Sequence, residues 1–296
     1  MTAPRQILPG SVYLVTRRCA QRQYLLRPSK TTNELFAFLL AVAAKRYGIL
    51  VHVFCVMSNH VHLVVTDTHA RLPEFHQYLD SLVARSVNSS LGSWETFWAP
   101  GSYSAVRLVA SEDIVREAAY VLANPAKAGL VRTGHLWPGL WSDPDLIGAG
   151  PTRVARPCHR FFAKKSALPE IAELELTAPA GFASAAEFRD RVVAAVKVHE
   201  EEAARRFRNE FQGAVRVLKQ KPRSRPRSKE PRRNLKPRVA AKDASKRVET
   251  LTSLDEFVRK YRAALARRRA GEKGVVFPAG TYQLRIAHGV PCAPCR

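Results

Sequence analysis

The sequence predicts an α+β fold: a ferredoxin-like antiparallel sheet with helices on one face, followed by a basic, partly disordered and α-rich C-terminal extension. Two observations predict it. Hydrophobic periodicity over residues 11–108 indicates the order strand, helix, strand, strand, helix, strand. The Lys and Arg residues concentrate in the second half, where the Pro-rich stretch 219–247 favours an extended or disordered arm.

The first strand and the first helix are expected near the N-terminus. Apolar residues mark a strand at 11–16, and a basic, polar loop follows it through residue 29. Thr31 and Glu34 have the spacing of a capping box, so we expect a helix to begin there. Apolar residues recur at helical intervals up to Gly48, which is expected to close the helix.

Two buried strands, a second helix and a short strand are expected next. The strands cover 49–56 and 59–66, and their continuous apolar character is typical of neighbouring strands in the middle of a sheet. Helical periodicity then runs from Leu72 to about Gly92, and a short strand is expected at 104–108.

A further helix is expected to carry a polar face with side chains suited to catalysis. Ser111 is the expected N-cap, and Pro125 is expected to end the helix because the residue before a proline avoids the helical region. Arg116, Tyr120 and Asn124 are spaced by four, so they share one face that differs from the apolar face. A phenol and a carboxamide therefore lie one turn apart.

Two histidines alternate with apolar residues on the second buried strand. His60 and His62 project to one face of the strand, whereas Val61 and Leu63 project to the other. Two imidazoles on one face, roughly 7 Å apart along the strand, can reach a single divalent cation. Half-buried strand histidines without a metal are the alternative, because a His-x-His pair alone is a weak signal.

Three motifs together resemble the single-tyrosine HUH transposases, and most closely their REP-associated tyrosine transposase branch. The motifs are Met-Ser-Asn-His-Val-His-Leu at 57–63 and Tyr-Val-Leu-Ala-Asn-Pro-Ala-Lys-Ala-Gly-Leu-Val at 120–131, and Tyr-Leu-Val-Thr-Arg-Arg at 13–18 resembles the first strand of that family. The resemblance covers about residues 10–135. This chain has Ser58 where the family usually has proline, which changes the turn before the histidine strand but removes no ligand.

The resemblance implies a nucleophilic tyrosine and a metal site. Tyr120 would attack a phosphodiester and become joined to the 5′ side of the break, releasing a 3′-OH. His60, His62 and Asn124 would bind the metal, with core packing and helix capping as the alternative roles. Nitrogen and oxygen ligands without thiolate favour Mg²⁺ or Mn²⁺ in function. The fold of this family is also ferredoxin-like, so both routes predict the same architecture.

The charge of the chain indicates a nucleic-acid partner. The formal net charge is +23 in 296 residues. Residues 1–150 hold 14 basic and 10 acidic residues, a balance of about +4, whereas the remainder holds 34 and 15, a balance of about +19. Such an imbalance favours DNA or RNA, with an acidic membrane surface as the lesser alternative.

Basic and aromatic side chains supply candidate DNA contacts. Phosphate binding is expected at Arg17, Arg18, Arg116, Lys127, Arg223, Arg225, Arg227, Arg232 and Arg233. A solvated surface or tail is the alternative for these residues. Trp94 and Trp98 are expected to pack in the core, with stacking on unpaired bases as the alternative.

The chain is expected to divide into four parts. They are a catalytic domain (1–150), a linker with an amphipathic helix (151–218), the basic Pro-rich arm (219–250) and a small helix-plus-hairpin element (251–296). The amphipathic helix is expected from about Ser184. The capping-box spacing of Ser253 and Glu256 predicts the last helix, and 275–277 and 282–286 are expected to pair as a hairpin.

These features favour a DNA transposase or strand transferase that cuts and rejoins single-stranded or hairpin DNA. Two alternatives stay open: a domesticated DNA-binding or repeat-maintenance protein with weak or lost cleavage, and a basic RNA-binding protein. Five scattered cysteines and the lack of a long apolar run favour a reducing, cytoplasmic compartment without membrane insertion, with the protein on the nucleoid when it binds DNA. The oligomeric state, monomer or homodimer, is left open.

Overall fold

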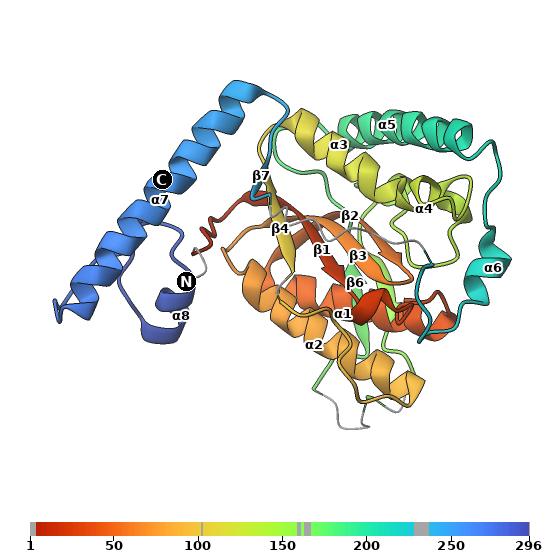
Figure 1. Ribbon diagram of the computed structural model, residues 1–296, viewed down its shortest axis with the longest axis horizontal. Helices are drawn as coiled ribbons and strands as arrows, with labels where there is room; N and C mark the ends of the chain where they lie inside the picture. Colours follow the sequence, from red (N-terminus) through yellow and green to blue (C-terminus); the bar gives the residue numbers. More distant parts are fainter. Residues whose placement is uncertain (1–3, 102, 159–160, 163–166, 228–236, 296) are drawn as a thin grey trace.

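The computed structural model describes residues 4–101, 103–158, 161–162, 167–227 and 237–295. Its main sheet has five strands in the order β2-β3-β1-β4-β7 (Figure 1). The strands are β1 (Ser11–Arg18), β2 (Ile49–Met57), β3 (His60–Asp67), β4 (Ser104–Leu108) and β7 (Val239–Ala240). The first four are antiparallel and have the ferredoxin-like order, which confirms the predicted fold class.

Helices cover both faces of this sheet. Helices α1 (Lys30–Tyr47) and α2 (Leu72–Leu91) pack together on one face, as predicted for the ferredoxin-like unit. Helices α3 (Ser111–Leu122) and α5 (Ala185–Arg206) pack together on the opposite face (Figure 1), which the prediction did not include. Two covered faces explain why β2 and β3 are apolar along nearly their whole length.

The register of the sheet sets which side chains share a face. Thr16 of β1 pairs with His62 of β3, and Arg18 of β1 pairs with His60 of β3. Because side chains alternate, these four residues project to the face that α3 covers, whereas Val61 and Leu63 project toward α1 and α2.

The helix ends follow local capping chemistry. Ser29 rather than Thr31 caps α1, because its Oγ accepts the N–H of Thr32. Gly48 ends that helix in the left-handed region at φ +64°, as predicted. Asp113 accepts the N–H of Ala110 at 3.2 Å and so fixes the start of α3, while Ser111 is its first residue.

The segment after α3 wraps the sheet. It contains the single turn α4 (Asn124–Lys127), the 3-10 turns η2 (Gly134–Leu136) and η3 (Pro144–Leu146), and an unpredicted ladder of β5 (Thr152–Ala155) with β6 (Ile171–Leu174) against α1. A further 3-10 turn, η1 (Ala20–Arg22), follows β1. Trp137 Nε1 donates to the carbonyl of Val56 at 3.0 Å, which ties this segment to β2.

The basic arm and the C-terminal element differ from the prediction. Part of the arm forms β7, which adds to β4 in parallel, and Lys242 N–H donates to Asp113 at 2.8 Å. The last long helix, α7 (Ala244–Arg269), begins at an Asp243 cap rather than at Ser253. Helices α6 (Ala214–Leu218) and α8 (Gln283–His288) complete the described elements.

The prediction of a hairpin at 275–286 is wrong. Residues 283–288 form α8, and Phe277 instead makes an isolated bridge with Cys292. The boundaries proposed for the four parts of the chain stay a prediction. Among the described helices, none is both long and apolar enough to span a membrane.

The two tryptophans after α2 occupy opposite environments. Trp98 packs in the core, as expected, and its Nε1 donates to the carbonyl of Asp80 at 2.8 Å. Trp94 does not pack in the core, because 91% of its surface is exposed.

Candidate active site

A cavity of about 320 Å³ lies where β1 ends and β3 begins, beneath the C-terminal ends of α3 and α5. Its walls come from five separate parts of the chain, so the site exists only in the folded protein. The lining residues are Arg18, Arg22, Asn59, His60, His62, Tyr120, Asn124, Lys127, Ala128 and Arg206.

The two histidines of β3 form the floor of this cavity. Their ring centroids are 4.8 Å apart and the rings are nearly perpendicular, at 84°. His60 Nδ1 lies 2.7 Å from Asn59 Oδ1, and the amide orientation follows from Asn59 Nδ2, which donates to the Arg22 carbonyl at 3.2 Å. Nδ1 of His60 therefore carries a proton.

His62 is held by a hydroxyl from the neighbouring strand. Its Nδ1 lies 2.8 Å from Thr16 Oγ1, the residue that pairs with it across β1 and β3. Burial, and then the charges of His60 and Arg18, hold the pKa of His62 well below its ordinary value, so the imidazole is neutral at pH 7. A neutral imidazole oriented by a polar partner is the form that binds a metal ion.

Tyr120 reaches the cavity from α3. Its ring centroid lies 5.5 Å from that of His62, at 77°, and the tyrosine is half-buried. Ala118 and Ala119, both fully buried, let the helix approach the sheet closely enough for this contact. The polar helix face predicted from sequence is therefore the face that meets the histidines.

Asn124 lines the same cavity from the start of α4 and is buried, with 7% of its surface exposed. The described residues contain no group of three His, Cys, Asp or Glu side chains suited to a metal ion. The Asn59 carboxamide also lines the cavity but is hydrogen-bonded to the Arg22 carbonyl and to His60, so the two imidazoles and the Asn124 carboxamide are the candidate donors for a cation. Such a nitrogen and oxygen donor set fits a divalent cation that keeps open positions for water or phosphate.

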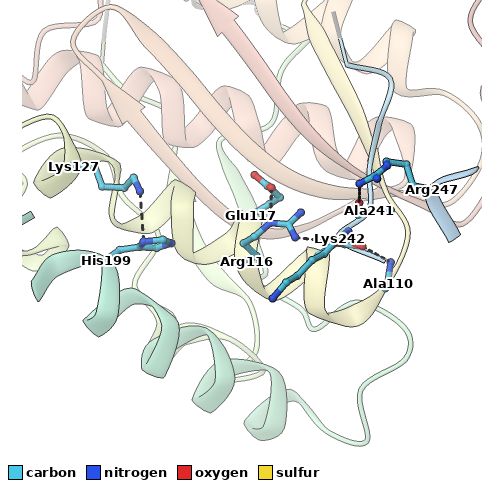
Figure 2. A network of polar contacts seen from close by, with 9 residues as sticks. Ala110, Arg116, Glu117, Lys127, His199, Ala241, Lys242 and Arg247 are labelled. Carbon is cyan, nitrogen blue, oxygen red and sulfur yellow. Dashed lines mark hydrogen bonds and ion pairs between the residues drawn. The ribbon is translucent and has the colours of Figure 1, made fainter. Parts of the chain in front are cut away.

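Lys127 places a positive charge beside the tyrosine. Its Nζ lies 5.5 Å from the centroid of the Tyr120 ring and 3.5 Å from Nδ1 of His199 on α5 (Figure 2). Nδ1 of His199 also lies 3.4 Å from Glu202. A helix from the second half of the chain thus fixes a cation at the cavity wall.

The arginines of the first half of the chain that were predicted to bind phosphate lie in different places. Arg18 lines the cavity, but Arg17 projects from the opposite face of β1, where it forms an ion pair with Asp80 at 3.3 Å. Arg116 does not line the cavity. Its guanidinium group donates to the carboxylates of Asp113 and Glu117 (Figure 2).

The first part of the basic arm lies next to the cavity. Ser224 accepts the N–H of Tyr24 at 3.0 Å, and Gln23 donates to the carbonyl of Arg223 at 3.3 Å. These contacts place the arm beside the loop that carries Arg22, a cavity residue. Arg223, Arg225 and Arg227 are exposed there, whereas Arg232 and Arg233 lie outside the described residues.

Sequence reasoning missed three polar residues of the cavity wall. Asn59 lies inside the histidine motif, so its position next to His60 was a readable signal. Arg22 lies in a loop, and Arg206 ends a helix far along the chain. Nothing in the local sequence distinguishes these two arginines from other surface arginines.

Comparisons with solved structures return the class of protein that the motifs resemble. The structure of a REP-associated tyrosine transposase bound to a REP hairpin matches with 16% identity and a TM-score of 0.40, over 47% of this chain and 81% of that chain. A candidate transposase from Deinococcus radiodurans R1 matches with 19% identity and a TM-score of 0.27, over 36% of this chain and 85% of that chain. No family model and no curated protein matches the chain.

Proposed function

We propose that this protein is a DNA transposase or strand transferase that cuts and rejoins single-stranded or hairpin DNA through Tyr120. One observation carries the proposal: a phenol, two oriented imidazoles, two carboxamides and four basic side chains line a single cavity. The phenol, the imidazoles and the Asn124 carboxamide also carry the motif resemblance, although they come from separate elements.

The proposed step exchanges one phosphate ester for another. Oη of Tyr120 attacks the phosphorus and loses its proton, the bond between phosphorus and the 3′ oxygen breaks, and that oxygen gains a proton as a 3′-OH. The phosphate on the 5′ side stays joined to Tyr120. A 3′-OH can then attack this phosphotyrosine and rejoin DNA without ATP, because the bond energy is retained.

His60, His62 and Asn124 would hold Mg²⁺ or Mn²⁺. When bound, the cation would polarise the phosphate and stabilise the charge that develops on it. The hydrogen bonds of His60 Nδ1 with Asn59 and of His62 Nδ1 with Thr16 support this role, because each fixes the orientation of its imidazole in the cavity wall.

The cations of the cavity wall would bind the phosphate and its neighbours. Lys127 lies over the Tyr120 ring. A positive charge there would stabilise a developing phenolate and the negative charge on the phosphate oxygens in the transition state. Arg18, Arg22 and Arg206 line the same cavity. One guanidinium group can bind two oxygens of a phosphate at once. The adjacent arm would continue this basic surface along the DNA strand.

A denaturing gel with labelled DNA hairpins tests the proposal. The expected result is a covalent protein–DNA adduct that requires Mg²⁺ or Mn²⁺ and is absent in Tyr120→Phe and His60→Ala. Tyr78→Phe on α2 and His288→Ala on α8 are matched controls, because both residues lie outside the cavity. Tight DNA binding without an adduct in any metal would instead support the repeat-maintenance alternative, and stronger binding to RNA would support the RNA-binding alternative.

A further inference from the structure

Trp94 differs from the other tryptophans of the chain. The sequence contains four, and all four are described. Trp98 and Trp137 are buried, and Trp141 is half-buried with its Nε1 donating to the Leu122 carbonyl at 3.0 Å. Trp94 alone leaves nearly its whole indole in water. Exposing a surface of this size forgoes the burial that normally stabilises a tryptophan.

The loop that presents Trp94 is fixed by hydrogen bonds on both sides. Gly92 ends α2 in the left-handed region at φ +61°. Asn88 then accepts the N–H of Ser93 at 2.9 Å through its carbonyl and donates to the carbonyl of Glu95 at 2.8 Å through its side chain. Phe97 is buried just beyond. The indole is therefore held outward from an ordered loop.

Just after Trp94, residues 97–99 of this loop run beside the segment that carries two cavity arginines. Ala99 donates its N–H to the carbonyl of Arg18 at 2.8 Å, and Ala20 donates its N–H to the carbonyl of Phe97 at 2.8 Å. Cys19 and Trp98 form an isolated antiparallel bridge between these two bonds. Arg18 and Arg22, at the ends of this short segment, both line the cavity.

We propose that Trp94 is a stacking platform for an unpaired base of the single strand that enters the cavity. The inference rests on the proposed function for the identity of the substrate as DNA. An exposed aromatic ring beside arginines is the combination that binds single strands, because the ring stacks on a base while the cations bind phosphates. A base in a duplex has both faces covered and cannot use the platform.

The surroundings of Trp94 favour a base over a protein partner. Its sequence neighbours Ser93, Glu95 and Thr96 are polar, and no other exposed large apolar side chain occurs in the described segment 82–101. A protein interface needs a contiguous apolar patch, whereas one planar base needs only one ring.

Tryptophan fluorescence in the absence of metal tests the inference without requiring cleavage. Titration with an oligothymidylate in EDTA is expected to quench the emission of the wild type, and Trp94→Phe is expected to remove this change. Trp94→Ala is expected to weaken single-strand binding on the order of tenfold, with Trp94→Phe in between. Leu136→Ala, which shortens another exposed apolar side chain, is the matched control and should bind like the wild type.

Duplex DNA and abasic oligonucleotides define the contact. Affinity for a closed circular duplex, which has no terminal base pair with an open face, is expected to be equal in the wild type and in Trp94→Ala. One abasic position in the single strand should weaken binding to the wild type and have no effect on Trp94→Ala, because the platform and the base act as a pair. Equal single-strand affinity in the two proteins, or an equal loss on duplex, would overturn the inference.

The two proposals can fail separately. If covalent adducts never form but Trp94 emission still responds to single strands, the cleavage proposal fails and the stacking platform stands. If adducts form while Trp94→Ala binds and cleaves like the wild type, the stacking platform fails and the cleavage proposal stands.

Discussion

Nζ of Lys127 and Nδ1 of His199 lie 3.5 Å apart, which joins the wall of the cavity beside Tyr120 to a helix outside the ferredoxin-like unit. Helix α5 also supplies Arg206 to the cavity and packs along α3, the helix that carries Tyr120. The second half of the chain therefore contributes α5 to the candidate active site, in addition to the basic arm.

Removing His199 is expected to slow adduct formation without weakening DNA binding. His199→Ala frees the Lys127 side chain, and losing one such contact costs roughly 1 kcal/mol, or about fivefold in rate. Single-turnover rates at saturating DNA measure the effect. Glu201→Ala, an exposed position on the same helix, is the matched control. Equal rates in all three proteins would show that the lysine needs no support from α5.

Arg18 and Arg17 are expected to have different roles, because adjacent side chains of β1 project to opposite faces. Arg18→Ala should weaken single-strand binding and reduce the salt slope of the binding constant by about 0.7, the value for one phosphate contact. Arg17→Ala should leave that slope unchanged and lower the free energy of unfolding by about 2 kcal/mol, since Asp80 loses its ion pair with Arg17. Binding titrations at several salt concentrations and urea denaturation separate the two effects; a smaller slope in Arg17→Ala would contradict the assigned faces.

His52 is expected to make the stability of the protein depend on pH. It is fully buried between the carbonyl of Thr177 and the hydroxyl of Thr66, each 2.7 Å from a ring nitrogen, and burial lowers its pKa to about 4. The unfolded chain binds a proton near pH 6.5, so stability is complete above that pH and falls as the pH drops toward 4. The loss is about 3 kcal/mol for this shift and levels off below pH 4.

Urea denaturation from pH 3.5 to 7.5 measures this dependence. Because the pKa of His62 is also lowered, the comparison with His52→Asn isolates the contribution of His52. The variant is expected to be less stable at pH 7 and to depend less on pH. A wild-type profile that stays flat between pH 6.5 and 4 would contradict the buried, neutral state of His52.

Local patterns predicted the parts of the fold that depend on local chemistry. The strand at 104–108, the closing Gly48 and the shared face of His60 and His62 all follow from alternation, propensity and capping, and the structure confirms them. Alternation along β1 also contained the information that Arg17 and Arg18 face opposite ways. The caps at Ser29 and Asp243 were readable as well, but other residues with cap spacing competed with them.

The remaining features depend on contacts between distant segments. Arg206 reaches the cavity, and His199 reaches Lys127, only because α5 packs on α3, and no local signal encodes that packing. Residues 239–240 form a strand because the edge of β4 offers them backbone partners, although their own sequence is that of an arm. Apolar alternation at 282–286 suggested a strand, but residues 283–286 belong to α8, the helix that Gly289 ends at φ +58°.

The most direct test of the central claim is to identify the residue that DNA modifies. After incubation with a hairpin and Mn²⁺, nuclease and trypsin digestion followed by tandem mass spectrometry should find a nucleotide joined through its 5′-phosphate to the peptide that contains Tyr120. The modification should be absent when EDTA replaces the metal. A nucleotide on any other side chain, or a 3′-phosphate linkage at Tyr120, would contradict the proposed chemistry.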